Sequence, residues 1–165
     1  MQSILISACL LGHKVRYNGS DAATGHVLLE QWTREGRVVG VCPEIAGGFP
    51  TPRPAAEITA GSGGAKVLQG LAQVRIANGD DVTTAFVVGA QQALAMAQAK
   101  GIRVAVLKEG SPSCGSAYTY DGSFTGGRTA LPGVTAALLQ QHGLKVFSEH
   151  QLNDAQAFLL ALDNP

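Results

Sequence analysis

The chain has 165 residues, of which 45% are hydrophobic, and its 12 basic and 12 acidic side chains give a formal net charge of zero. This length and hydrophobic content predict one domain over residues 1–165 and argue against a disordered chain. A neutral chain without a block of like charge excludes strong non-specific binding to duplex DNA or to an anionic membrane.

Strands and helices are expected to alternate along the chain. In order, the main elements are a strand at about residues 3–8, a helix at about 21–34, a strand at about 37–41, a helix at about 82–99, a strand at about 103–107, a helix at about 133–142, a strand at about 144–147 and a helix at about 153–162. This alternation predicts an α/β fold, a Rossmann-like three-layer sandwich around a mainly parallel sheet.

Shorter features lie between these elements. Two β-hairpins are expected, one joining residues 66–69 to 72–76 near Gly70 and one over residues 118–125 that turns at Asp121-Gly122. Residues 42–54 contain four prolines and two glycines, which predicts an ordered, stiff loop without regular structure. Asp80 or Asp81 is expected to cap the helix at 82–99.

The three cysteines of the chain each follow an apolar run. Cys9 and Cys42 end the first two runs, and Cys114 follows the third across a short loop. Because the carboxyl ends of parallel strands share one edge of a sheet, we expect the three thiols to converge there. Three thiolates without a fourth protein ligand indicate a metal centre with one open position, as in catalytic sites.

The compartment is predicted from the same residues. An odd number of cysteines argues against a disulfide framework, and thiols kept for a metal suit a reducing cytoplasm. The chain enters its first strand without a secretory leader, and no apolar stretch reaches transmembrane length. We therefore expect a cytoplasmic protein that does not enter the membrane.

Taken alone, these residues leave other interpretations open. The cysteines could be buried structural residues, could bind a catalytic zinc, or one could be a nucleophile, although no histidine has ligand spacing to a cysteine. Glu44, two residues after Cys42, could move a proton or could only pair with Arg53. Ser111 and Ser113 could be ordinary turn residues beside a proline.

Motifs around the cysteines carry a resemblance. They are Ser7-Ala8-Cys9-Leu10-Leu11-Gly12, Val15-Arg16-Tyr17, Cys42-Pro43-Glu44-Ile45-Ala46-Gly47-Gly48, Pro52-Arg53-Pro54, Ser111-Pro112-Ser113-Cys114-Gly115-Ser116, Gly133-Val134-Thr135-Ala136 and Val146-Phe147-Ser148-Glu149. Together, and in this order, they resemble the bacterial thiouracil desulfurase family. The resemblance covers nearly the whole chain, which makes it more specific than any single motif.

The resemblance implies an enzyme with a 4Fe–4S cluster. By position, Cys9, Cys42 and Cys114 would ligate three irons, and the fourth iron would have no protein ligand and could take sulfur from the substrate. Catalytic roles are implied for Glu44 and Ser111. The implied reaction converts a thiolated uracil, as base or nucleotide, to uracil or its nucleotide and sulfide without redox chemistry, and cluster-assembly machinery would load the cofactor.

A small substrate is expected, because no broad basic surface is available for tRNA. Arg16 could bind a phosphate, and so could Arg128 in the glycine-rich segment 126–129, although that segment could equally be a plain loop. Ser113 is a further candidate for substrate contact, whereas Lys108 is expected in solvent. A cluster-carrying or regulatory protein and a zinc- or cysteine-dependent hydrolase remain the alternatives.

Overall fold

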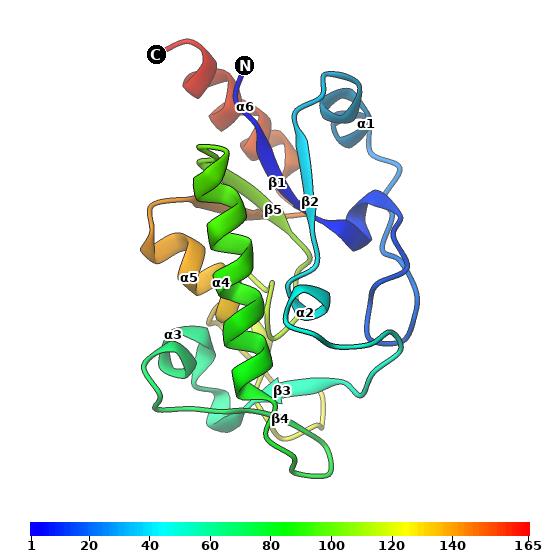
Figure 1. Ribbon diagram of the computed structural model, residues 1–165, viewed down its shortest axis with the longest axis vertical. Coiled ribbons are helices and arrows are strands. Elements are labelled where there is room, and N and C mark those ends of the chain that lie inside the picture. The colour runs from blue at the N-terminus through cyan, green and yellow to red at the C-terminus, as the bar shows by residue number, and fades with distance from the viewer.

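Four parallel strands form the central sheet of the computed structural model, which describes residues 1–165 (Figure 1). The strands are β1 (Ile4–Ser7), β2 (Val38–Val41), β5 (Val104–Leu107) and β8 (Lys145–Ser148), in the order β2-β1-β5-β8. All residues of the two central strands β1 and β5 are buried, as expected for parallel strands covered on both faces. The mainly parallel α/β sheet predicted from the sequence is confirmed.

Helices cover both faces of this sheet. Helices α1 (Val27–Arg34) and α6 (Leu152–Asp163) lie on one face, where Ile4 and Ile6 pack with Trp32 and Leu159. Helices α4 (Thr83–Ala99) and α5 (Val134–Gln141) lie on the other, where Leu5 packs with side chains of both helices. Successive residues of a strand point to opposite faces, so β1 contributes to both cores and the molecule has three layers.

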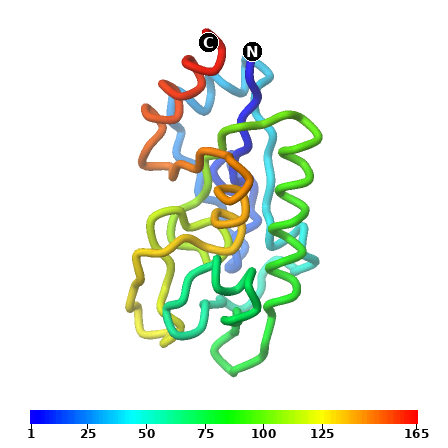
Figure 2. Tube along the Cα trace, turned by 90° about the vertical axis from the view of Figure 1, so that its left-hand side faces the viewer, coloured from blue at the N-terminus to red at the C-terminus, as the bar shows by residue number.

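Smaller elements gather beyond the carboxyl ends of the strands, at the opposite end of the molecule from the two termini (Figures 1 and 2). They are the 3-10 helices η1 (Ala8–Leu11) and η2 (Thr59–Gly61), the short helices α2 (Pro43–Ala46) and α3 (Gly63–Leu68), and the antiparallel pairs β3 (Ala56–Ile58) with β4 (Val74–Ile76) and β6 (Thr119–Tyr120) with β7 (Arg128–Thr129). None of the helices has the length and hydrophobicity needed to span a bilayer.

The first predicted hairpin is wrong. Residues 66–68 belong to α3, and residues 74–76 pair instead with residues 56–58. Gly70 has a φ of 75° and its N–H donates to the Val67 carbonyl, so this glycine ends a helix rather than turning a hairpin. A three-residue strand such as 56–58 is too short to give a period that sequence analysis can detect.

The second predicted hairpin is correct in its first strand only. Residues 119–120 pair with 128–129, because the Asp121 carboxylate accepts the N–H of Ser123 and forms a turn inside a longer loop. The helix expected at 21–34 begins only at Val27, and His26 accepts the N–H of Leu28 at that point. Asp81 accepts the N–H of Thr83 at the start of α4, as predicted.

The segment 42–54 is not entirely irregular, because Pro43 begins the one-turn helix α2. A proline suits the first helical position, where its missing N–H would have no partner. Helix α2 lies directly against α4, and a Cβ atom added to Gly89 would overlap the Pro43 carbonyl oxygen. A Cβ added to Gly47 would overlap the Ala85 carbonyl oxygen in the same way. The two backbones therefore touch, and α4 fixes the position of α2.

This contact predicts an unusual effect of Gly89→Ala. In an exposed helix the change stabilises by about 0.8–1 kcal/mol, but here the added methyl group must separate the two helices. We expect a net loss of about 1–3 kcal/mol in the free energy of unfolding, measured as a lower urea midpoint. Gln92→Ala, on the exposed side of α4, is the matched control and should change little; an unchanged or raised midpoint for Gly89→Ala would contradict the contact.

Candidate functional site

The three cysteines lie at the same edge of the sheet and line one cavity of about 390 Å³. Cys9 lies in η1, which follows β1 without a break, and Cys42 joins β2 to α2. Cys114 lies in the loop after β5. Because β1 pairs in parallel with both β2 and β5, three segments distant in sequence leave the sheet side by side. The structure thus brings together the thiols that the sequence suggested would converge.

Burial makes the thiols difficult to ionise on their own. Burial, and then the charge of Cys42, raise the pKa of Cys9 to about 11. Burial raises the pKa of Cys114 still further, and the charge of Cys9 adds to this rise. Burial also raises the pKa of Cys42, although the N–H groups of Ile45 and Glu44 oppose it. Two buried sulfurs and one half-buried sulfur that repel one another as thiolates are a donor set that a cationic metal group would stabilise.

The arrangement suits a cluster better than one zinc ion. Zinc would lie about 2.3 Å from every ligand sulfur, whereas no three His, Cys, Asp or Glu side chains are placed to hold one metal ion. The irons of a cluster are separate atoms, so its ligands need not meet at one point. Thiolates are the usual ligands of iron–sulfur clusters, and backbone N–H groups directed at a ligand sulfur, as at Cys42, commonly tune them. The residues present therefore fit a 4Fe–4S group.

A buried arginine holds Glu44 at the wall of the cavity. Glu44 lies in the first turn of α2, and its Oε2 is 2.9 Å from Nη2 of Arg53, which confirms the expected pair. The Arg53 side chain is only 2% exposed and also donates to the carbonyls of Val15 and Pro50 and to the Thr51 hydroxyl. Its Nε has no partner. Arg53 thus ties the first loop to the Glu44 carboxylate and fixes both.

Ser111 and Ser113 have different surroundings. The Ser111 hydroxyl oxygen accepts the N–H groups of Ser113 and Cys114, so Ser111 shapes the turn that carries a ligand cysteine. It also lines the cavity, where its hydroxyl proton remains available. Ser113 does not line the cavity; it is buried, and its hydroxyl lies 2.7 Å from that of Thr135 in α5.

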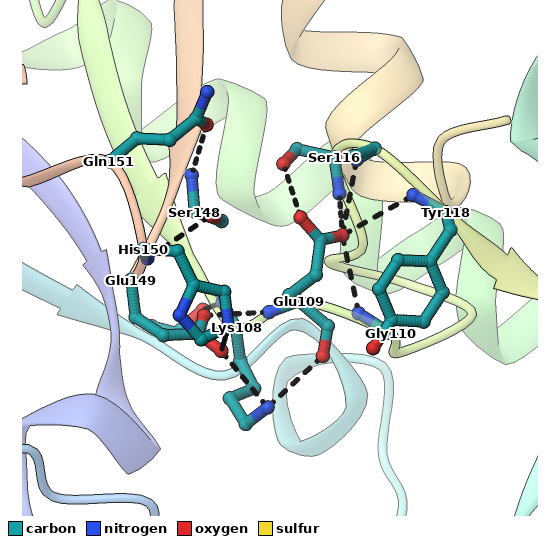
Figure 3. Close-up of polar contacts among 11 residues, drawn as sticks. Lys108, Glu109, Gly110, Ser116, Tyr118, Ser148, Glu149, His150 and Gln151 are labelled. Atoms are coloured by element: carbon teal, nitrogen blue, oxygen red, sulfur yellow. Dashed lines mark hydrogen bonds and ion pairs between the residues drawn. The ribbon is translucent and has the colours of Figure 1, made fainter. Parts of the chain in front are cut away.

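Glu109 is a site residue that sequence reasoning missed. Its buried carboxylate accepts backbone N–H groups of Ser116, Ala117 and Tyr118, together with the Ser116 hydroxyl (Figure 3). These bonds close the loop that carries Cys114 around one side chain. The only sequence signal was a glutamate two residues after a strand, at the start of a loop rich in small residues.

Two other charged residues, Lys108 and Glu57, line the cavity. Lys108, expected in solvent, is 27% exposed, pairs with Glu149 at 3.1 Å and lines the cavity. Glu57 accepts the N–H groups of Gly122 and Phe124 and so holds the loop between β6 and β7. Lys108 directly follows β5 and Glu57 lies within β3, and only the tertiary structure decides which partners the two residues find.

The two candidate phosphate-binding arginines are placed differently. Arg16 lines the cavity, and its guanidinium has no hydrogen bond or ion pair with the rest of the chain. Arg128 does not line the cavity; its guanidinium carbon lies 4.2 Å from the centre of the Tyr118 ring. Residues 128–129 form β7, and α5 begins only at Val134, so segment 126–129 does not form a loop at a helix N-terminus.

The aromatic side chains Tyr118 and Tyr120, at the start of the segment predicted to form a hairpin, also line the cavity. Their rings are perpendicular, with centres 6.1 Å apart. Phe124 lies at the same rim. The cavity is thus lined by thiols, charged groups and aromatic rings.

Comparison with known proteins identifies the family. The family model of 2-thiouracil desulfurase matches residues 4–151. A protein of Bacillus subtilis strain 168, the uncharacterized protein YbbK, is 47% identical over 151 residues, which are 92% of this chain and 98% of the relative. A solved structure of the 4Fe–4S-dependent thiouracil desulfidase TudS superposes with a TM-score of 0.87 at 46% identity, covering 98% of this chain and 99% of that chain. The resemblance inferred from the cysteine motifs is confirmed, and the chain belongs to the 2-thiouracil desulfurase family.

Proposed function

We propose that this protein is a 4Fe–4S-dependent desulfurase that converts thiouracil or a thiouridine nucleotide to uracil or the uridine nucleotide, with release of sulfide and no net electron transfer. The observation that carries the proposal is one cavity lined by three thiols and by the Glu44–Arg53 pair. The similarity to TudS over almost the whole chain supports it.

Cys9, Cys42 and Cys114 would hold three irons, and the fourth iron would have no protein ligand. Such a cluster, once loaded by the assembly machinery of the cell, supplies a Lewis acid that prefers the soft sulfur of a thiocarbonyl to a hard oxygen. The protein binds and orients the ring, positions water and moves protons. A cavity of about 390 Å³ is of a size that suits a small heterocyclic ligand.

The side chains of the cavity have separate tasks in this reaction. Glu44 accepts a proton from the water that adds to the ring carbon, and Arg53 keeps the carboxylate in one orientation. The Ser111 hydroxyl donates to a polar atom of the substrate. Tyr118 and Tyr120 offer aromatic surface to the pyrimidine ring. Arg16 supplies the unpaired positive charge for a nucleotide phosphate.

The other classes of function explain fewer of these features. A cluster carrier or regulatory protein has no need of a carboxylate that a buried arginine orients inside a cavity. A hydrolase with one zinc ion requires three ligands that meet at a point, and no such trio is present. A cysteine nucleophile requires a base, and no histidine lines the cavity.

Removal of any ligand cysteine should release the cluster. Anaerobically reconstituted protein should be brown, with about four irons and four sulfides per chain, and Cys9→Ala, Cys42→Ala or Cys114→Ala should each lose most of the iron. Iron, sulfide and zinc analysis measures the result. A triple variant that keeps its iron, or a native protein that contains only zinc, would contradict the assignment.

Glu44→Gln should retain the cluster and lose sulfide release by about 100-fold or more, because glutamine cannot accept a proton. The unfolding midpoint must be measured in the same variant, since glutamine leaves Arg53 buried without its counter-charge. Ser111→Ala should cause a smaller loss if the hydroxyl only orients the substrate. Glu30→Gln, on an exposed position of α1, is the control; near-native turnover by cluster-replete Glu44→Gln would remove Glu44 from the mechanism.

We expect Arg16 to lower KM for a nucleotide substrate but not for the free base. Arg16→Gln should raise KM for a thiouridine monophosphate by about tenfold, the loss expected from one charge-assisted contact, and should leave KM for thiouracil nearly unchanged. Arg128→Gln should have a smaller effect, because Arg128 lies behind Tyr118, and Arg34→Gln on α1 is the control. Efficient turnover of thiolated tRNA alone would contradict a small-substrate enzyme.

A further inference from the structure

The side chain of Lys108 is oriented by two acceptors at the carboxyl end of β5 (Figure 3). Its Nζ donates to the Glu149 carboxylate and to the Glu109 carbonyl, each at 3.1 Å. An ammonium group carries three protons, so one proton of Lys108 has no partner in the protein. Because Lys108 lines the cavity, this proton is available to a molecule bound there.

The partner carboxylate is itself fixed. The Glu149 side chain directly follows β8 and is 8% exposed, and its Oε2 accepts the N–H of Glu109 at 2.8 Å. The exposed His150 ring lies 3.5 Å from the same carboxylate on its solvent side. Because the backbone fixes this buried carboxylate, the carboxylate determines the position of the ammonium group. The tail motif that ends at Glu149 therefore acts on the cavity through Lys108, which lines it.

The Lys108 ammonium group and the Glu44 carboxylate affect the pKa values of different cysteines. Burial and the charge of Cys42 raise the pKa of Cys9, and Lys108 opposes this rise more than any other charge. Glu44 instead contributes to the raised pKa of Cys42 and of Cys114. The backbone N–H of Lys108 also donates to the hydroxyl of Ser7, two residues before Cys9. A proton acceptor, Glu44, and a proton donor, Lys108, thus line the same cavity.

We propose that Lys108, oriented by Glu149, is the general acid that protonates the sulfur as it leaves the substrate. The inference rests on the proposed function. Water adds its oxygen to the ring carbon and gives a proton to Glu44. Sulfur takes a proton from Lys108 while the carbon–sulfur bond breaks, and its electron pair leaves with hydrosulfide. The remaining hydroxyl proton passes to water and the carbonyl forms; Glu44 then gives its proton to solvent, and the neutral amine regains a proton from solvent.

Replacement of the sulfur by selenium tests this role. Selenide is less basic than sulfide and leaves with less help from an acid, so a variant without the acid should be less impaired with it. Lys108→Met should lower kcat for thiouracil by about 100-fold, and for the corresponding selenouracil by about tenfold or less. Glu149→Gln should show the same pattern in weaker form. Lys100→Met, at the exposed end of α4, is the matched control and should keep native kinetics with both substrates.

Binding of hydrosulfide provides a readout that needs no turnover. Hydrosulfide is titrated into cluster-replete protein and followed by the visible absorption of the cluster, with iron and sulfide content measured in every variant. Lys108→Met should weaken hydrosulfide binding by about tenfold, because a charge-assisted contact is lost. Lys108→Arg should restore this binding but not turnover, since arginine keeps the charge and does not give up a proton at neutral pH.

The outcomes separate this inference from the proposed function. Equal losses for thiouracil and selenouracil in Lys108→Met would show a merely structural role and overturn the inference, and so would native hydrosulfide affinity. A rise in KM confined to the nucleotide would place Lys108 at the phosphate and would also overturn it. If the unaltered protein releases no sulfide at all, the proposed function fails, and the hydrosulfide titration still decides whether Lys108 meets the sulfur anion.

Discussion

The parallel pairing of β1 with β2 and β5 is the constraint on which the site depends. Ile4 lies opposite Val38 in one neighbour, and Leu5 lies opposite Ala105 in the other. All three strands run in one direction, so the chain leaves the sheet three times at the same edge. Reversal of one strand of four residues would move its cysteine by about 13 Å, to the other side of the sheet. The cavity is therefore a consequence of strand direction first and of loop sequence second.

Beyond that edge, the chain has little regular structure, and charged side chains hold its loops in place. The carboxylates of Glu109, Glu57 and Glu149 accept backbone N–H groups of the surrounding loops, and Arg53 donates to backbone carbonyls. A buried donor left without such a partner would cost about 1–3 kcal/mol. Apolar packing holds the sheet and its helices, whereas hydrogen bonds to charged groups fix the walls of the cavity. The same charged residues are then available to orient catalytic groups, as Arg53 orients Glu44.

Elements long enough to show a regular hydrophobic pattern were predicted from the sequence, and elements too short to show one were missed. Apolar runs and helical spacing are sufficient for the four strands and four main helices, and strand direction then places the cysteines. Strand β3 and helix α3 were missed because three or six residues carry almost no period. The start of α1 was placed too early because no proline or glycine excludes a helix over residues 21–24.

The polar partners of the site were less predictable. The pair of Glu44 and Arg53 was foreseeable, since both residues lie in one short segment. Lys108 and Glu149 are 41 residues apart, and nothing in the sequence shows that β5 and β8 are neighbours. Ser113 was judged by its closeness to Cys114 in the chain, yet its hydroxyl faces Thr135. Closeness in sequence does not determine the direction of a side chain in an irregular loop.

The pair β6 and β7 contains only two residues in each strand, and it carries Tyr120 at one wall of the cavity, with Arg128 behind the aromatic rings. A two-stranded pair has little independent stability, whereas the four-stranded sheet is covered on both faces. The two sides of the cavity therefore belong to regions that open locally with different free energies, and backbone amides of the wall should exchange with solvent well before those of β1 and β5. Such an uneven distribution of local stability lets the β6–β7 wall open while the central sheet that carries the cysteines stays folded.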